Sequence, residues 1–222
     1  MNAHTGISRR HLLSMAVAVG GLAMSGGVRS VLAQAFKRTP GQILGPFYPV
    51  LKPLDQDADL TTIAGKEGHA QGQVIHVMGR VLNLQGQPVE GARVEIWQAN
   101  THGRYNHPSD TNPAPLDANF EGFAVLTTDM EGRYRFKTIK PGAYPAGPDL
   151  IRPPHIHFEV TGKINRLVTQ MYFAGEPLND KDPFLQGAGS SKERLWVNLR
   201  PPTSELEPDS LLAVWDIILD KG

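Results

Sequence analysis

Two histidines one residue apart form the strongest chemical signal in this chain. His155 and His157 lie in the run Arg-Pro-Pro-His-Ile-His-Phe, which begins at Arg152 and which we expect to form a β-strand. Side chains two positions apart on a strand share a face, so both imidazoles would point the same way while Ile156 and Phe158 point into a core. Neutral imidazoles side by side are typical ligands of a metal ion. Taken alone, the pattern equally fits two surface or hydrogen-bonded histidines.

Two tyrosines in expected loops add to this signal. Tyr105 lies in Gly-Arg-Tyr-Asn-His, within residues 100–121, which are polar and rich in Pro and Gly. Tyr144 lies in Pro-Gly-Ala-Tyr-Pro. Long loops without periodicity are usually functional or disordered in compact domains. A single loop tyrosine is by default a partly exposed aromatic side chain, so these two become informative only together with the His-x-His strand.

Short apolar alternations between turns indicate the fold that must position these residues. The expected strands cover 74–82, 92–97, 122–128, 134–136, 154–160 and 167–173, and a last apolar stretch covers 211–219. Many short strands with Gly and Pro turns are typical of an all-β protein, here an antiparallel β-sandwich. Residues 79–144 resemble a prealbumin-type sandwich unit. Because such units are often plain binding or structural modules, a metal-free binding module is one hypothesis for the function.

The N-terminal part of the chain predicts export. Arg9 and Arg10 precede an apolar run rich in Gly and Ala at 12–24, and Ala33 and Ala35 offer cleavage points. This is the pattern of a twin-arginine signal, and the run is too short and too rich in Gly for a good membrane span. We therefore expect a periplasmic or extracellular protein with no membrane contact after cleavage. An ordinary secretory signal and a retained anchor are the alternatives.

Composition limits the remaining chain to one domain. A signal at 1–33 leaves 189 of the 222 residues, enough for one sizeable core. We expect an N-terminal arm at 34–71, rich in Pro, Gly, Asp and Thr, and a sandwich domain with long active-site loops at 72–222. The signal removes three of the 22 basic residues and no acid, which leaves 19 basic and 22 acidic residues. This weak charge predicts no nucleic-acid partner. Without cysteine, no disulfide stabilises the exported chain.

Several ordered motifs match one known family at the same time. They are GPFYP from residue 45, WQAN from 97, GRY from 103, PLDANF from 115, TIKPGAYP from 138, RPPHIHF from 152 and TQMYF from 169. In these motifs the chain resembles the intradiol ring-cleavage dioxygenases, and it looks closest to the β-chain of the protocatechuate 3,4-dioxygenases. The similarity covers nearly all of the chain after the signal.

This resemblance implies a non-haem Fe(III) centre. Its ligands would be Tyr105 and His155 in equatorial positions and Tyr144 and His157 in axial positions. A trivalent cation stabilises a phenolate, and hard phenolate oxygens favour Fe(III) over Fe(II). Zinc is the alternative because His-x-His suits it, which would make the chain a zinc or other hydrolytic metalloprotein, yet two tyrosine ligands would be unusual for zinc.

The resemblance also implies a reaction. A catechol-type diol, such as catechol, protocatechuate or hydroxyquinol, would be cleaved by O2 between its two hydroxylated carbons to a cis,cis-muconate. Tyr144 would leave the metal and take up a proton, while Arg152 and Gln170 would stabilise negative charge on the substrate. Ala146 stands where protocatechuate enzymes commonly have Trp, so the shape of the pocket and the ring substituent stay open. Those enzymes use two related subunits, and for this single chain a homo-oligomer is also open.

Overall fold

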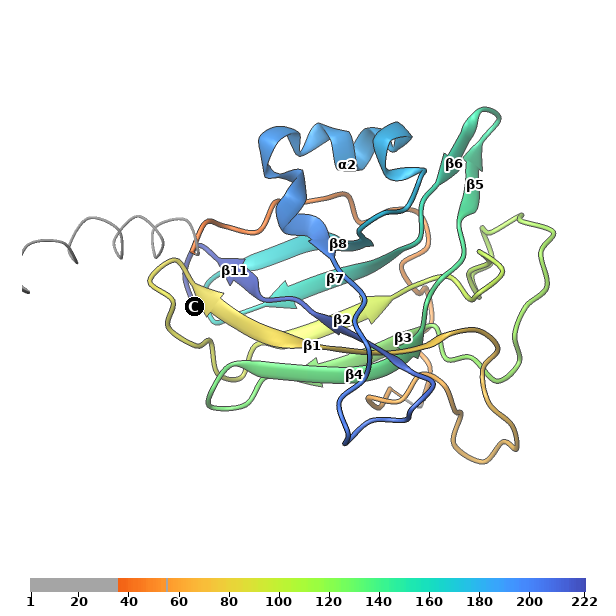
Figure 1. The fold of residues 1–222 in the computed structure, drawn as a ribbon, viewed down its shortest axis with the longest axis horizontal. Coiled ribbons are helices and arrows are strands. Elements are labelled where there is room, and N and C mark those ends of the chain that lie inside the picture. The colour runs from red at the N-terminus through yellow and green to blue at the C-terminus, as the bar shows by residue number, and fades with distance from the viewer. Residues whose placement is uncertain (1–35, 55) are drawn as a thin grey trace, which may run out of the picture. The chain divides into compact units, whose positions relative to one another are not determined.

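Two β-sheets packed face to face form the body of this computed structural model, which describes residues 36–54 and 56–222 (Figure 1). The predicted signal at 1–33 lies outside the described residues. The described residues from Phe36 to Gly222 belong to one compact unit, so the N-terminal arm packs with the sandwich. Among the described residues, no helix is long and apolar enough to cross a membrane.

The first sheet is built around one long strand. β1 (Val74–Asn83) pairs antiparallel with β4 (Arg133–Ile139). On its other edge, β10 (Leu211–Val214) and β11 (Ile217–Leu219) pair with it in parallel, one after the other. The apolar stretch at 211–219 therefore forms two strands.

The second sheet carries the His-x-His strand at its centre. Its order is β3-β2-β7-β8-β9. The strands are β3 (Phe123–Thr127), β2 (Arg93–Trp97), β7 (His155–Thr161), β8 (Arg166–Phe173) and β9 (Trp196–Val197). The first four pair antiparallel and the short β9 pairs in parallel with β8. The prediction of an all-β sandwich is confirmed, and the long strands are antiparallel as expected.

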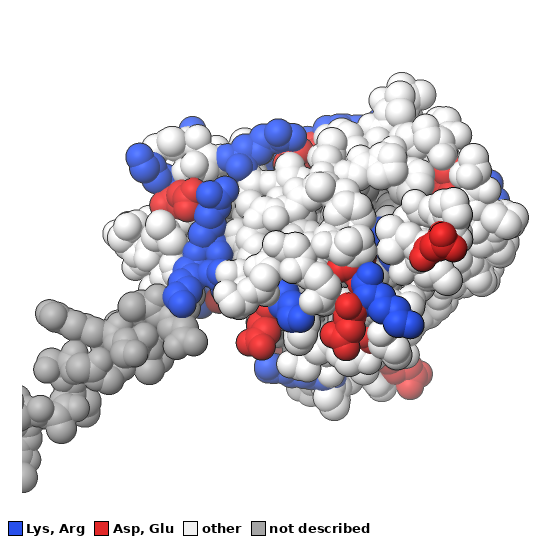
Figure 2. Space-filling model, turned by 90° about the horizontal axis from the view of Figure 1, so that it is seen from above, with Lys and Arg blue, Asp and Glu red and all other residues white. Residues whose placement is uncertain are grey.

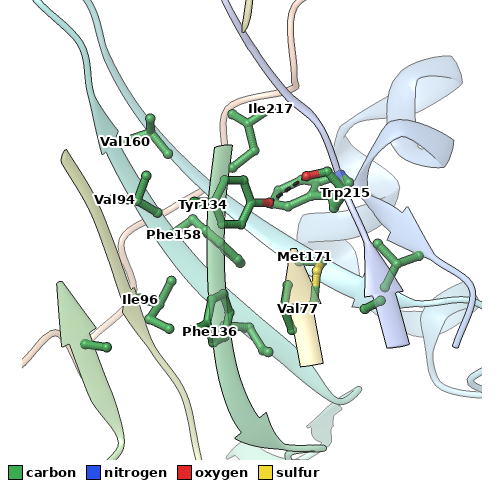
Figure 3. Packing of buried hydrophobic residues seen from close by; sticks show 14 of the residues in the cluster. Val77, Val94, Ile96, Tyr134, Phe136, Phe158, Val160, Met171, Trp215 and Ile217 are labelled. Carbon is green, nitrogen blue, oxygen red and sulfur yellow. Dashed lines mark hydrogen bonds between the residues drawn. The ribbon is translucent and has the colours of Figure 1, made fainter. Parts of the chain in front are cut away.

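Apolar side chains at alternate strand positions fill the space between the sheets. Figure 3 shows Ile96 of β2 and Phe158 of β7 lying with Phe136 of β4 in this core. The ring of Phe158 lies edge-on to Trp215, with 5.0 Å between centroids. The buried hydroxyl of Tyr134 donates a hydrogen bond of 2.6 Å to the carbonyl oxygen of Trp215 (Figure 3). This bond fixes the segment between β10 and β11 onto the first sheet.

A hairpin and a helical segment lie beyond the two sheets. β5 (Tyr144–Gly147) and β6 (Leu150–Arg152) form the hairpin, which projects from the sandwich (Figure 1). Tyr144 was expected in a loop, and it begins β5 instead. After β8, η1 (Asn179–Lys181), α2 (Pro183–Gly187) and η2 (Gly189–Leu195) follow in turn. The sequence pattern did not predict this helical segment.

Charged side chains do not form one continuous patch on the face drawn in Figure 2. Basic and acidic side chains surround a broad area without charge. Phosphate backbones are bound mainly by clustered Lys and Arg side chains. The centre of this face therefore carries no cluster of basic side chains.

Candidate metal centre

His155 and His157 lie on the face of β7 that points away from the sandwich core. The alternate residues Ile156, Phe158 and Val160 are fully buried between the sheets. Both histidines are buried as well, with exposed fractions of 2% and 1%. Their Nε2 atoms lie 3.2 Å apart. The structure therefore brings the two imidazoles together on one face, as period-two alternation predicts.

The hydrogen bonds of His155 determine which of its nitrogens has a free lone pair. Nδ1 lies 2.7 Å from the carbonyl oxygen of Pro153. A carbonyl oxygen only accepts, so Nδ1 holds the proton and Nε2 has the lone pair. Burial, and then the positive charge of Arg152, hold the pKa of both His155 and His157 well below its usual value. Both rings are therefore neutral, as metal ligands must be.

Packing fixes the plane of the His157 ring. His157 lies directly across the sheet from Trp97, the last residue of β2. The two rings are stacked, with 4.9 Å between centroids and an interplanar angle of 11°. Nδ1 of His157 is buried and has no hydrogen-bond partner among the described residues. The stacked indole therefore helps to orient this imidazole.

Tyr105 and Tyr144 complete the cluster of four side chains. Their rings lie edge to face, with 5.3 Å between centroids, and both are buried. The ring of Tyr144 lies 5.5 Å from that of His155, and the ring of Tyr105 lies 6.3 Å from that of His157. Burial raises the pKa of both phenols. Burial therefore disfavours the phenolate form here, and a bound cation would favour it.

The hydroxyl of Tyr105 has no hydrogen-bond partner among the described residues, although it is buried. Leaving a buried polar group without a partner costs about 1–3 kcal/mol. A metal ion bound between the four side chains would give this oxygen a partner. The isolated hydroxyl therefore fits a site that holds a cation.

Close backbone packing brings the two tyrosine segments together. A Cβ atom at Gly142 would lie 2.4 Å from the carbonyl oxygen of Thr101. The N–H of Gly142 donates to the carbonyl oxygen of Asn100 at 2.9 Å. Within the loop, the carboxylate of Asp110 accepts from the N–H of Tyr105 at 2.7 Å. The long polar segment at 100–121 is thus held by its own side chains.

Arg152 joins the cluster through a buried guanidinium. Its Nε donates to Asp182 at 2.8 Å, and both side chains are almost fully buried. Asp182 also caps α2 by accepting from the N–H of Leu185 at 2.8 Å. The guanidinium carbon lies 4.5 Å from the ring centre of Phe184. Sequence reasoning missed Asp182, although Asp followed by Pro183 is a signal for the start of a helix.

The other nitrogens of Arg152 reach the proposed site residues. Nη2 donates to Oε1 of Gln170 at 2.8 Å and to the hydroxyl of Tyr172 at 2.7 Å. Nη1 lies 3.1 Å from Nε2 of His155 and 3.5 Å from the hydroxyl of Tyr144. The structure therefore places Arg152 and Gln170 beside the four-residue cluster. Tyr172 was also missed, and its position two residues after Gln170 on one strand face could have indicated it.

A cavity of about 490 Å³ opens beside the cluster. Its lining includes Phe47, Tyr144, Ala146, Arg152 and Phe184. Of the four clustered side chains, only Tyr144 is among the described residues that line it. A larger cavity, of about 740 Å³, is lined mainly by residues of β1, β4 and the loops beside them, and by none of these four. The side chains that line the smaller cavity, and not its volume, therefore identify it as the candidate binding site.

The donor set decides which metals fit. The described residues contain no group of three or more His, Cys, Asp and Glu side chains that could hold a metal ion. A metal in this cluster would therefore need the phenol oxygens of Tyr105 and Tyr144. Two imidazole nitrogens and two phenol oxygens fit a hard, highly charged transition-metal ion better than zinc.

Known proteins are similar to this chain in sequence and in fold. A family model described as Dioxygenase matches residues 43–221. The protocatechuate 3,4-dioxygenase beta chain of Burkholderia cepacia is 50% identical over 174 residues, which is 76% of this chain and 73% of that protein. This agrees with the resemblance expected from the sequence motifs.

More distant relatives extend the comparison. The hydroxyquinol 1,2-dioxygenase of Rhodococcus opacus is 31% identical over 180 residues, which is 74% of this chain but only 56% of that enzyme. Among solved structures, the dioxygenase domain of a carbohydrate-binding fusion protein from Streptomyces sp. SirexAA-E superposes with a TM-score of 0.64 at 26% identity. That match covers 84% of this chain and 100% of the domain.

Proposed function

This chain belongs to the intradiol ring-cleavage dioxygenase family, and from that premise we propose that the cluster around His155 and His157 holds a non-haem Fe(III) ion. The enzyme would use it, with O2, to open a catechol-type ring between the two hydroxylated carbons and give a cis,cis-muconate. One observation carries the proposal. Two neutral imidazoles and two buried phenols converge at the edge of a cavity, and one phenol oxygen lacks a partner.

Tyr105, Tyr144, His155 and His157 would hold the metal. Bound there, Fe(III) would supply the positive charge that stabilises phenolates and would make a chelated diol reactive toward O2. Zinc is less well supported, because two tyrosine oxygens are unusual ligands for it.

The residues that line the cavity have separate roles in the proposal. Tyr144 reaches both the cluster and the cavity, so its oxygen, as a phenolate stabilised by the cation, would be placed to take up a proton that a diol loses on binding. Arg152 lines the same cavity and is held in place by Asp182 and Gln170. Its fixed positive charge would stabilise negative charge that develops on the substrate.

We propose a one-ring aromatic diol and O2 as the substrates. The relatives act on protocatechuate and hydroxyquinol, as their names state. A cavity of about 490 Å³ has room for one such ring. Ala146 lines this cavity, so the space around the ring depends on a small side chain at this position. A homo-oligomer is compatible with the proposal.

We also propose that residues 1–33 direct export by the twin-arginine route to the periplasm or the medium. The paired Arg9 and Arg10 before an apolar run support this proposal. Replacing both with Lys should leave folded protein in the cytoplasm, because the pathway reads the arginine pair and not the charge. Cell fractionation measures the result, and unchanged export of the variant would point to the ordinary secretory route.

The colour of the purified protein tests the metal. Iron-loaded wild type should be red to brown because tyrosinate-to-Fe(III) charge transfer absorbs visible light. Tyr105→Phe should weaken this band, and His155→Ala should lower the iron content. Tyr134→Phe is the control, since this buried tyrosine lies in the core and donates to Trp215. A wild type that stays colourless after reconstitution under air would refute the ferric site.

Product identification tests the reaction in the same samples. Oxygen uptake should be followed with catechol, protocatechuate and hydroxyquinol, and the product should be a colourless muconate. At matched iron content, Arg152→Ala should be slower by about 100- to 1000-fold, as is common when an electrostatic donor is lost. A yellow semialdehyde, or a variant as fast as wild type, would contradict the assigned mechanism.

A further inference from the structure

A buried carboxylate lies on the outer face of the second sheet, outside the cluster of four. Glu95 of β2 is 1% exposed. Its neighbours Val94 and Ile96 pack into the core, so Glu95 points to the opposite face, as Trp97 does. Burying a carboxylate is costly unless it is paired and hydrogen-bonded. Its partners therefore indicate what the residue does.

Two of these partners come from the N-terminal arm. The hydroxyl of Tyr48 donates to Oε2 of Glu95 at 2.5 Å, and Nζ of Lys52 donates to Oε1 at 2.7 Å. Arg93 of the same strand also pairs with Oε1. Burial alone would raise the pKa of Glu95, but the hydrogen bonds from Lys52 and Tyr48 and the charge of Arg93 lower it. Glu95 is thus an ionised anchor for residues 45–52 of the arm, which we call the clamp segment.

Besides its ring contacts, the clamp segment has few other attachments to the sandwich. Gln42 and Gln56 on either side of it form backbone hydrogen bonds to β8 and β3. Between them, no backbone–backbone hydrogen bond joins the described arm residues to a strand. Val50 and Leu51 are 71% and 87% exposed, so they bury little apolar surface. Apart from the ring contacts of Phe47 and Tyr48, the contacts of Glu95 are therefore the main attachment of this segment to the sandwich.

The clamp segment packs directly on the proposed metal ligands. The ring of Phe47 stacks on Tyr105, with 4.6 Å between centroids and an angle of 29°. The backbone approaches His157 so closely that a Cβ atom at Gly45 would lie 3.1 Å from its Cε1 atom. The ring of Tyr48 lies edge-on to Trp97 at 5.0 Å, and Trp97 in turn stacks on His157.

We propose that Glu95 is a positioning residue for the metal centre. It ties the clamp segment to β2, and the segment then holds the rings of Tyr105 and His157 in the orientation that the metal needs. Glu95 itself touches neither the metal nor the substrate. The inference rests on the proposed function, because it assumes a metal between the four side chains. Groups that orient metal ligands commonly change metal affinity by about 10- to 100-fold when they are removed.

The test uses the full-length, iron-loaded protein and three variants. Glu95→Ala removes the anchor, Glu95→Gln removes its charge, and Tyr48→Phe removes one hydrogen bond while the ring stays on Trp97. The measurements are the rate of iron release to a chelator, the position of the visible band, and deuterium exchange of the backbone amides at 43–54. Glu159→Gln is the matched control, because Glu159 lies directly across the sheet from Glu95 and pairs with Arg166 instead.

Glu95→Ala should release iron about 10- to 100-fold faster, shift the visible band and speed up exchange at 43–54, while exchange in β1 and β4 stays as in wild type. Glu95→Gln and Tyr48→Phe should change the same quantities less. If the Glu95→Ala variant does not fold, these two variants test the proposal instead. The control should match wild type.

Two results would overturn the proposal. In one, exchange at 43–54 rises but iron release and the band stay unchanged, so the segment does not position the ligands. In the other, exchange rises throughout the core strands, so Glu95 only stabilises the fold. A wild type that binds no iron would instead refute the proposed function, and the exchange data would still decide whether Glu95 holds the segment over Tyr105 and His157.

Discussion

The buried ion pair between Arg152 and Asp182 connects the candidate metal centre to the helical segment above it. Arg152 reaches Tyr144 and His155 with one nitrogen, while Asp182 caps α2. A buried pair of this kind contributes little net stability, because removing both charges from water is costly. Loss of one partner is far more damaging, since it leaves a buried charge without compensation.

Asp182→Asn should therefore lower the free energy of unfolding by about 3–5 kcal/mol. Asparagine caps a helix about as well as aspartate, so the loss reports the missing charge and not the cap. Urea denaturation measures the effect, and Asp180→Asn, an exposed position on the same segment, is the control. A loss of less than 1 kcal/mol would mean that Arg152 does not depend on this carboxylate.

Single residues were predictable where strand geometry links them. His155 and His157 share a face because strands alternate. Gln170 was expected only from the family resemblance, and the register of β7 and β8 places it directly across from His157. Tyr172 and Asp182 were not predicted. Tyr172 reads as one more aromatic residue of a buried strand, and Asp182 meets its partner 30 residues away in sequence, where no local pattern connects them.

At the level of elements, the sequence does not show whether the two tyrosine segments are ordered. Residues 100–121 are polar enough for either an ordered or a disordered loop, and composition alone does not distinguish the two. In the structure, the side chain of Asn100 accepts from the N–H groups of His102 and Arg104 at 2.9 and 3.0 Å. The loop at 100–121 is therefore ordered by side-chain-to-backbone hydrogen bonds and by contact with residues 142–144, which are distant in sequence.

Gly142→Ala should separate the two tyrosine segments. Its Cβ atom would lie 2.4 Å from the carbonyl oxygen of Thr101 and 2.5 Å from the nitrogen of Gly103, so backbone must move. We expect a loss of about 1–3 kcal/mol in unfolding free energy and a weaker visible band, because Tyr144 would shift relative to Tyr105. Gly147→Ala, at the end of β5 and with no atom within 4 Å of its Cβ, is the control. A visible band of equal strength in the Gly142→Ala and Gly147→Ala variants would contradict this account.

For the whole molecule, the sequence predicted the fold class but not which strands pair with one another. Alternation shows which side chains of a strand are buried, and this was enough for an all-β sandwich. It does not show which strands are neighbours, so the parallel pairing of β10 and β11 with β1 could not be read from it. That pairing depends on the path of residues 200–210, which brings the C-terminal strands alongside β1.

Glu207 ties this path to the first sheet and makes the stability of the fold depend on pH. Its carboxylate pairs with Lys137 of β4 at 2.6 Å and with His76 of β1, and these two residues face each other across the sheet. The hydrogen bond from Lys137, and then the one from His76, lower the pKa of Glu207 to about 2. A carboxylate with a lowered pKa stabilises the fold above its unfolded pKa, and this contribution is lost as the pH falls toward the folded value.

Glu207→Gln should therefore lower the free energy of unfolding at pH 7 and leave it unchanged near pH 2. Because the side chain of Glu207 is 48% exposed, solvent screens the pair and we expect a loss of about 0.2–1 kcal/mol. The difference between variant and wild type should vanish as the pH falls from about 4.5 to about 2. Urea denaturation at several pH values measures it. Glu205→Gln is the control, since Glu205 is exposed on the same path and forms no ion pair within the described part of the chain. A difference that persists at pH 2 would show that Glu207 acts by packing and not by charge.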